Sequence, residues 1–370
     1  MYRKFHSKLR HITRIGVITL SLCFLDNAYA TGVFDSISEE VNRIFQKSSP
    51  AIVKVRSVSG SSPLAGTGFF INDSGLILTS YAVVRDSPKA WIEYDERKLT
   101  ANILGRDVRS GVALLQVDEA DTPFLDLGDS SDLKMASGLV SVAYPYNLPL
   151  APAFGFVTGF DVRYLNRFFA TTHIRANVKV SPGQIGGPLL NTNGKVVGLM
   201  VLAVQEGKEC YALPSNSANR IISDILENGK ARHGWVGVGV IESKKSESDL
   251  HKSVIVSNLY RNTPAAQSGL EPGDVVRKIG DQIVTTPSDI LDAAFFSTVG
   301  KPVPVEVIRN GEKMVFSLPI VERPEQQRPV DSLIKPGKDT MIAPFVSPQK
   351  EKQKSKAMPA SGQASNPQSL

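Results

Sequence analysis

Two glycine-rich stretches decide the expected fold of this chain: Gly66-Thr-Gly-Phe-Phe-Ile71 and Ser181-Pro-Gly-Gln-Ile-Gly-Gly-Pro-Leu-Leu-Asn191. Around them, from Ser49 to about Ala212, short runs rich in Val, Ile and Leu alternate with Gly, Asp, Asn and Pro. Short strands at this spacing predict a pair of β-barrels or a β-sandwich. The runs expected as strands are Ala51–Val58, Gly68–Asn72, Leu76–Ser80, Gly111–Val117, Gly138–Ala143, Val178–Val180 and Val196–Val201.

Helical periodicity occurs at the edges of this region. The approach segment carries Ile37, Val41, Ile44 and Phe45 at helical spacing. Residues 217–228 place four apolar side chains on one face, and Gly229 follows as a stop signal. These four residues are Ile221, Ile222, Ile225 and Leu226.

A second module runs from His233 to about Val321. It opens with Trp235-Val-Gly-Val-Gly-Val240, and a strand is expected at Val254–Val256. The turn Asn262-Thr-Pro264 follows, and a helix is predicted over Ser288–Thr298 with Ser288 as its cap. About ninety residues are enough for one small domain.

The two ends of the chain differ from its middle. Residues 1–30 combine a basic start, the apolar run Ile15–Leu25 and the small-residue pattern Ala28-Tyr-Ala30, which is typical of a signal peptide cleaved after Ala30. Export to the bacterial periplasm is therefore expected, and an uncleaved N-terminus that anchors the chain in the inner membrane is the alternative. Residues 322–370 are rich in Pro, Lys and Gln, which predicts a disordered tail.

Charge and cysteine content exclude several classes of protein. The net charge is +6, but residues 1–30 and the tail contain most of the basic excess, so residues 31–321 are close to neutral. This balance argues against nucleic-acid binding. After cleavage Cys210 would be the one remaining cysteine, which excludes an internal disulfide and predicts a buried structural thiol. The histidines are too few and too far apart for a metal site, and no cofactor is expected.

The order and spacing of these motifs resemble the HtrA/Deg family of trypsin-like serine proteases. The stretches already quoted, together with Asp73-Ser-Gly-Leu-Ile-Leu-Thr79 and Gly194-Lys-Val-Val-Gly198, are similar to the protease domain of that family. The stretch Thr263-Pro-Ala-Ala-Gln-Ser-Gly-Leu-Glu-Pro-Gly-Asp274 resembles its PDZ domain. The resemblance implies a mainly β protein, in which a two-barrel trypsin-like domain (chymotrypsin fold) precedes an α+β PDZ domain. The expected division is 1–30 signal peptide, 31–48 N-terminal segment, 49–230 protease-fold domain, 233–321 PDZ domain and 322–370 tail.

The resemblance also locates the positions of a catalytic triad, and each of them is substituted. The histidine position corresponds to Ala82, the aspartate position to Gly111 and the nucleophile position to Ile185. Moreover, no histidine lies between His11 and His173, so the first barrel has no base. His173, Ser80 and Ser181 are weak substitutes. The loop residues Gly183, Gln184 and Ile185 are still expected to present backbone amides to a peptide.

For peptide binding, the resemblance implies a groove in the PDZ domain. The residues carried over to it are Trp235, Val236, Gly237, Val238, Ile290, Leu291 and Ala294. The leading hypothesis is a non-enzymatic pseudoprotease of the cell envelope that binds peptides or unfolded proteins as a chaperone-like, scaffold or regulatory partner. Assembly as a homotrimer, or with an active relative, would use Val33, Phe34 and the Val41/Ile44/Phe45 face. The alternatives are an active HtrA-type endopeptidase in protein quality control and a structural envelope scaffold.

Overall fold

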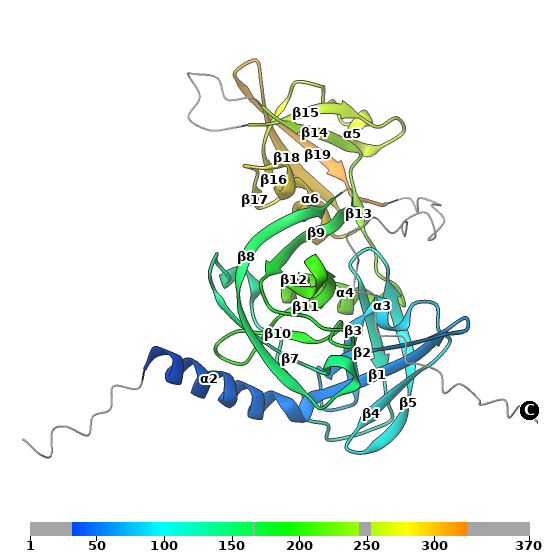
Figure 1. The fold of residues 1–370 in the computed structure, drawn as a ribbon. Coiled ribbons are helices and arrows are strands. Elements are labelled where there is room, and N and C mark those ends of the chain that lie inside the picture. The colour runs from blue at the N-terminus through cyan, green and yellow to red at the C-terminus, as the bar shows by residue number, and fades with distance from the viewer. Residues whose placement is uncertain (1–31, 166, 244–252, 324–370) are drawn as a thin grey trace, which may run out of the picture.

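The computed structural model describes residues 32–165, 167–243 and 253–323. The predicted signal peptide and residues 324–370 of the predicted tail therefore lie outside the described residues. The predicted start of the tail at Glu322 is wrong, because Glu322 belongs to strand β20 (Val321–Glu322) and pairs with Gly234. The described chain forms two closed β-barrels followed by a smaller module of strands and helices (Figure 1). This arrangement confirms the predicted fold class. No described helix has both the length and the apolar character needed to cross a bilayer.

Each barrel has six antiparallel strands. The first barrel has the order β1-β2-β3-β6-β5-β4, with bounds Ile52–Ser59, Ser62–Phe70, Leu76–Ser80, Val112–Gln116, Arg97–Asp107 and Ala90–Tyr94. The second has the order β10-β11-β12-β9-β8-β7, with bounds Pro188–Leu190, Val196–Val204, Glu209–Pro214, Arg167–Ala176, Ala151–Tyr164 and Gly138–Ala143. One apolar cluster, which includes Val53, Ile77, Leu139 and Leu189, draws residues from both barrels and packs them together.

Two of the sequence predictions for this region are wrong. Val178–Val180 is not a strand, although Val178 and Val180 are both buried. The segment leaves β9 for the loop before β10, and the Val180 amide donates to the Gly207 carbonyl at 2.8 Å. Its apolar character therefore reflects burial and not pairing in a sheet. Leu226 was expected on the buried face of its helix, but it is 55% exposed.

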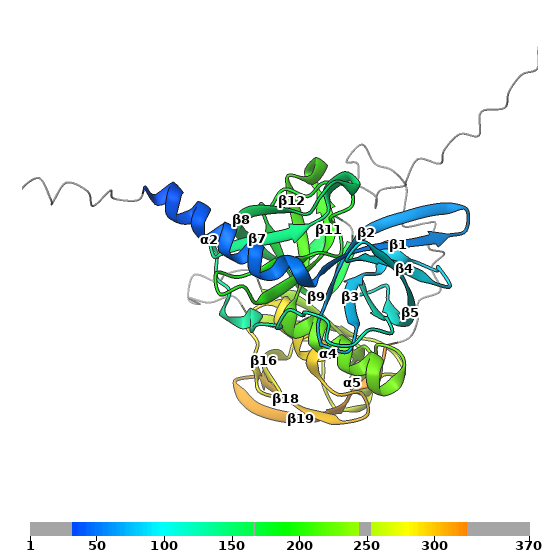
Figure 2. The ribbon, with the colours of Figure 1, turned by 90° about the horizontal axis from the view of Figure 1, so that it is seen from below.

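Three helices and four 3₁₀ turns accompany the barrels. Helix α2 (Val33–Ser48) packs along β7 and β8 through Ile44, Val41 and Phe45, and its N-terminal end projects beyond the second barrel (Figure 2). Helix α4 ends at Gly229, whose φ of 72° closes the last turn. The remaining bounds are α3 Tyr81–Val84, α4 Ser215–Asn228, η1 Ser49–Ala51, η2 Ser130–Asp132, η3 Pro145–Asn147 and η4 Gln205–Gly207.

The second module consists of an open sheet covered by a helix. The sheet order is β14-β15-β16-β18-β19, with β17 paired to β16, and β13 pairs with β20. The bounds are β13 Gly234–Trp235, β14 Val238–Glu242, β15 Val254–Leu259, α5 Pro264–Gln267, β16 Val275–Ile279, β17 Gln282–Ile283, α6 Pro287–Phe296, β18 Pro302–Arg309, β19 Glu312–Pro319 and β20 Val321–Glu322. Thr286, and not Ser288 as predicted, caps α6, because Asp289 completes its capping box.

Helix α6 joins this module to the second barrel. The Asp292 carboxylate accepts hydrogen bonds from the Thr172 amide at 2.8 Å, from the Thr172 hydroxyl at 2.6 Å and from the Thr171 hydroxyl. Three residues further along, Phe295 is 2% exposed and belongs to the same apolar cluster as Ile221 of α4. One helix therefore takes part in the packing of both units.

A side-chain contact between His233 and Asp107 makes a second link between the units. His233, in the segment between α4 and β13, places Nε2 2.9 Å from Oδ2 of Asp107 at the end of β5. Burial would raise the pKa of Asp107, but hydrogen bonds from His233 and Ser110 and the charge of His233 outweigh it, and the net shift is downward. The guanidinium of Arg220 on α4 contributes a further positive charge near Asp107. The ionised form of Asp107 is therefore favoured in the folded chain.

We expect Asp292→Ala to loosen the contact between α6 and β9. Each hydrogen bond to a charged group contributes about 1.5–3 kcal/mol, and the substitution leaves Thr171 and Thr172 without their acceptor. Added protease should then cut the segment 229–233 faster than in the natural chain, and the radius of gyration from X-ray scattering should increase. Glu312→Ala, on the exposed end of β19, is the control. Unchanged cleavage in Asp292→Ala would contradict this role.

We expect the stability contributed by Asp107 to depend on pH. Because the pKa of Asp107 is lower in the folded chain, its contribution is present above the unfolded value of about 3.9 and is lost as the pH falls through the folded value. The difference in melting temperature between the natural chain and Asp107→Asn should therefore be largest near pH 7 and shrink below about pH 4. Asp281→Asn, at a fully exposed carboxylate, serves as the control. A difference that stays constant with pH would show that Asp107 acts without its charge.

Candidate functional site

The candidate site is the loop Ser181–Gly187, which leads into β10. Gly183 and Gly186 have φ of +96° and +89°, a region that favours glycine. A Cβ at Gly183 would lie 2.6 Å from the Tyr144 carbonyl oxygen, and one at Gly186 would lie 2.2 Å from the Thr67 carbonyl oxygen. Both glycines are therefore required by the close approach of the neighbouring backbone.

Thr67 on β2 holds this loop against the first barrel. Its amide donates to the Ile185 carbonyl at 2.9 Å, and its hydroxyl donates to the Gly183 carbonyl at 2.8 Å. The same hydroxyl accepts from the Tyr144 amide at 3.1 Å. Two carbonyls of the loop are thus engaged with one residue. Within the described part of the chain, the Gly183 and Ile185 amides donate a hydrogen bond to no residue.

The three positions that the resemblance assigned to a triad have apolar or backbone surroundings. Ala82 on α3 and Ile185 on the loop belong to one apolar cluster, and Ile185 is only 3% exposed. The Tyr81 amide, next to Ala82, donates to the Gly111 carbonyl at 2.7 Å. A Cβ at Gly111 would lie 3.1 Å from the Val201 side chain. None of the side chains at Ala82, Gly111 and Ile185 has a nitrogen or oxygen atom that could transfer a proton.

The described histidines lie elsewhere. His173 on β9 is 1% exposed, stacks on Phe169 at 4.2 Å between ring centroids and has Nδ1 2.9 Å from the Thr171 carbonyl oxygen. His233 pairs with Asp107, a contact that sequence reasoning missed because the two residues are far apart in the chain. Ser80 accepts from the Ala82 amide at 3.2 Å as a helix cap. These groups therefore stabilise local structure in this conformation.

Cys210 and the side chain of Gln184 also have structural surroundings. Burial raises the pKa of the Cys210 thiol to about 12, so the thiol is protonated at neutral pH and not poised as a nucleophile. The Gln184 side-chain oxygen accepts from the Ser181 amide at 2.6 Å and closes the loop on itself. In the described ranges, no three His, Cys, Asp or Glu side chains lie close enough together to hold a metal ion.

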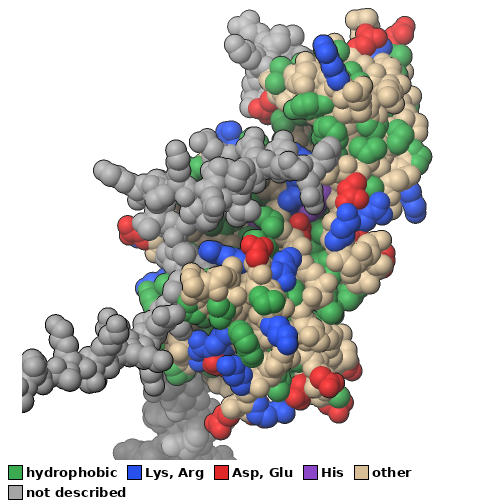
Figure 3. Space-filling view, turned by 90° about the vertical axis from the view of Figure 1, so that its right-hand side faces the viewer, with side chains coloured by type: hydrophobic (Ala, Val, Ile, Leu, Met, Phe, Trp, Pro, Cys, Tyr) green, Lys and Arg blue, Asp and Glu red, His purple; other side chains and the backbone are tan. Residues whose placement is uncertain are grey.

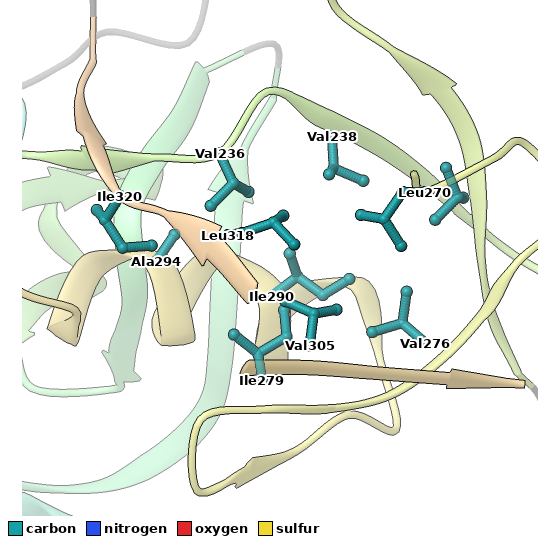
Figure 4. A pocket seen from close by; sticks show the side chains of 11 residues that line it. Val236, Val238, Leu270, Val276, Ile279, Ile290, Ala294, Val305, Leu318 and Ile320 are labelled. Atoms are coloured by element: carbon teal, nitrogen blue, oxygen red, sulfur yellow. The ribbon is translucent and has the colours of Figure 1, made fainter. Parts of the chain in front are cut away.

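The second module contains a small apolar cavity between α6 and the strands (Figure 4). Four residues that the resemblance placed in a peptide groove line it: Val236, Val238, Ile290 and Ala294. Seven further residues line it and were missed, because their strand and turn positions carry no groove signal in the sequence: Val256, Leu270, Val276, Ile279, Val305, Leu318 and Ile320.

Three other groove candidates do not line this cavity. Trp235 contacts Tyr260, with ring centroids 5.8 Å apart. Gly237 has φ of +78°, and a Cβ there would lie 2.3 Å from the Thr263 side chain. Leu291 is half-buried on α6. Of these three, Gly237 is the one whose conformation requires glycine.

Comparison with known proteins agrees with this architecture. Residues 66–199 match the trypsin-like peptidase domain family, and residues 234–320 match the PDZ domain family. A Pseudomonas putida protein and a Halomonas elongata protein, both named "Probable periplasmic serine endoprotease DegP-like", are 31% and 29% identical over 70% and 71% of this chain. The matched regions span only 56% and 57% of those relatives, so the chain corresponds to little more than half of their length.

Solved structures show the same fold. A chain titled "HtrA-type protease AlgW with tripeptide" superposes with a TM-score of 0.67 at 22% identity, covering 77% of this chain and 98% of the other. The serine endoprotease from Yersinia pestis superposes with a TM-score of 0.58 at 22% identity, with the same coverages.

These findings contradict one prediction made from the sequence. The chain was expected not to be an enzyme, but the relatives are named serine endoproteases and the matching structures are proteases of the HtrA type. The prediction relied on the residues at three positions, whereas the comparison uses the similarity of the whole chain to serine endoproteases. By this comparison the prediction is wrong. The family of the chain follows from the order of its two domains and from the relatives that it matches. The chain is a homologue of the DegP/HtrA proteases and belongs to the HtrA/Deg family, with a trypsin-like peptidase domain followed by one PDZ domain.

Proposed function

We propose that the chain is an HtrA-type endopeptidase of the cell envelope that acts on extended segments of unfolded proteins. The observation that supports this proposal best is the loop Pro182–Gly187, whose Gly183 and Ile185 amides are used by no other described residue. Backbone amides held in this way stabilise the negative charge that develops on the carbonyl oxygen of a peptide under attack. The relatives' names support the same class of reaction.

The envelope location is supported by two observations. The relatives are named as periplasmic proteins, and residues 1–30 have the basic, apolar and small-residue pattern of an export signal. We propose cleavage after Ala30, with an uncleaved anchor in the inner membrane as the alternative.

The groove of the second domain is proposed to hold the substrate. PDZ domains add an extended peptide as a strand at the edge of their sheet. The edge strand β14 and the apolar cavity beside α6 provide such an edge and a pocket for an apolar side chain, with Val236, Val238, Ile290 and Ala294 as its contacts. The Gly237 amide is proposed to donate a hydrogen bond to the C-terminal carboxylate of the peptide.

The chemistry of cleavage has one constraint. The positions that the resemblance assigns to the triad hold Ala82, Gly111 and Ile185, which neither accept nor release a proton. Loop amides and substrate binding without a complete triad still accelerate hydrolysis by about 10³–10⁴ over water alone. We therefore expect slow cleavage, in which the loop polarises the peptide carbonyl and water attacks it.

A second candidate function is the holding of unfolded chains, and the apolar lining of the groove favours it. When cleavage is slow, a bound segment spends most of its time held and not cut.

Val33 and Phe34, 76% and 83% exposed on α2, are the proposed contacts to further copies of the chain or to an active relative. Basic, acidic and hydrophobic side chains are intermixed on the face shown in Figure 3.

The first test measures cleavage of a permanently unfolded, reduced protein by the purified chain. We expect slow cleavage that is lost in Gly183→Ala, because the new Cβ collides with the Tyr144 carbonyl and displaces the loop amides. Gly194→Ala is the matched control, since Gly194 also has a positive φ of +74° but no atom within 4 Å of an added Cβ. Absence of cleavage by the natural chain would refute the endopeptidase proposal, and cleavage that survives in Gly183→Ala would place the reaction elsewhere.

The second test restores the triad with Ala82→His, Gly111→Asp and Ile185→Ser. Val201→Gly is added to make room at Gly111, because both Cβ and Cγ1 of Val201 lie 3.1 Å from an added Cβ, and Asp tolerates the positive φ there. We expect the cleavage rate to rise by at least about 10²-fold, a part of the roughly 10⁴–10⁶ that a complete triad contributes. The control carries Ile185→Ala in place of Ser and lacks only the nucleophile. Equal rates in the two variants would show that these positions are not the triad positions.

A further inference from the structure

A small second pocket lies directly beside the loop at Gly183. Its walls are formed by β1 through Lys54 and Arg56, by Tyr144 and Asn147 from the segment between β7 and β8, and by Gly183 itself. Lys54 and Arg56 are two residues apart on one strand, so their side chains leave the same face of the sheet. The side chains of Lys54 and Arg56 are only 20% and 23% exposed. The pocket is therefore cationic and partly shielded from water.

One carboxylate offsets the two cations of this pocket. Glu93 on β4 pairs closely with Arg56 and lies 4.0 Å from the Lys54 ammonium. The three charged groups together carry one net positive charge. The Lys54 ammonium also lies 4.9 Å from the centroid of the Tyr144 ring and 3.5 Å from the Asn147 carbonyl oxygen. The Glu93 carboxylate and the Asn147 carbonyl oxygen are both far from the Lys54 ammonium, so an acceptor at a shorter distance would form a stronger hydrogen bond with it.

The backbone beside the pocket is strained. Tyr146 and Asn147 have φ of +49° and +61°, which is unusual for two consecutive residues other than glycine. Hydrogen bonds hold this conformation: the Tyr146 amide donates to the Pro182 carbonyl at 2.6 Å, and Arg56 donates to the Asn147 side-chain oxygen at 2.6 Å. The strain orients Asn147 toward the cations of β1 and couples the pocket to the loop. Strain of this kind persists where the surrounding contacts impose it, and it is concentrated at functional sites.

We propose that this pocket binds a carboxylate of the polypeptide whose neighbouring carbonyl is held by the loop amides, either an Asp or Glu side chain or the C-terminus of the chain. The inference rests on the proposed function and adds a substrate preference to it. A carboxylate beside Lys54 forms a charge-assisted hydrogen bond in a site of restricted solvent access, where such bonds are stronger than in water. A neutral amide of the same shape gains no such bond.

The test uses fluorescein-labelled decapeptides of Ala, Val and Ser that contain a single Glu or Gln, each with an amidated or a free C-terminus. Binding to the full chain is measured by fluorescence anisotropy. For the natural chain we expect about tenfold tighter binding of the peptides that carry the carboxylate, the range of one hydrogen bond to a charged group. The preference should fall to less than twofold in Lys54→Met, which keeps the length of the side chain and removes its charge. It should return in Lys54→Arg.

Lys98→Met is the matched control, because the Lys98 ammonium also lies over an aromatic ring, 5.3 Å from the centroid of Trp91. A preference for Glu in amidated peptides that is lost in Lys54→Met identifies a side chain as the ligand of this pocket, and a preference for the free acid that is lost in Lys54→Met identifies the C-terminus. Absence of both preferences, or their survival in Lys54→Met, overturns the proposal and assigns any remaining carboxylate binding to the groove of the second domain. Cleavage of the unfolded protein is measured in the same preparations, so that failure of the endopeptidase proposal is seen separately.

Discussion

The contact between Thr67 and the loop before β10 is the constraint on which the rest of the site depends. Two hydrogen bonds from one residue of the first barrel fix two carbonyls of a loop that belongs to the second barrel. The Gly183 and Ile185 amides donate to no described residue. The two barrels thus meet through the backbone and not only through apolar packing. The hydrogen bonds from Thr67 engage backbone carbonyls, so they do not depend on the side chain at position 185.

Helix α6 has a comparable role for the second domain. Ile290 and Ala294 line the apolar cavity of that domain, whereas Asp292 and Phe295 contact β9 and the cluster around α4. The two faces of this short helix are therefore committed to different partners. Movement of the helix toward or away from the groove must change its contacts with the barrel as well, because the same backbone bears both sets of side chains.

Much of the architecture could be predicted from the sequence, because strand runs, glycine positions and motif order are local signals. The strand Leu76–Ser80 and the helix that ends at Gly229 have the expected bounds to within a residue or two. The prediction for Val178–Val180 was wrong because buried coil and buried strand have the same apolar composition. The pairing of His233 with Asp107 and the anchoring of Asp292 could not be predicted, since both join residues more than a hundred positions apart. The family of the protein likewise emerged from comparison of the whole chain with its relatives. Ala82, Gly111 and Ile185 alone led to the prediction that the chain is not an enzyme, which that comparison contradicts.

Closure of the barrels has a further consequence for the proposed function on unfolded chains. A closed barrel has no edge strand, so its backbone groups are paired all the way round and cannot template the addition of a foreign strand. In the described residues, the largest open sheet is that of the second domain, whose outer strands are β14 and β19. Unpaired strand edges are therefore concentrated in the PDZ domain, where the peptide groove is proposed. In the proposed function, most of the β structure would be closed to strand addition by an aggregation-prone substrate.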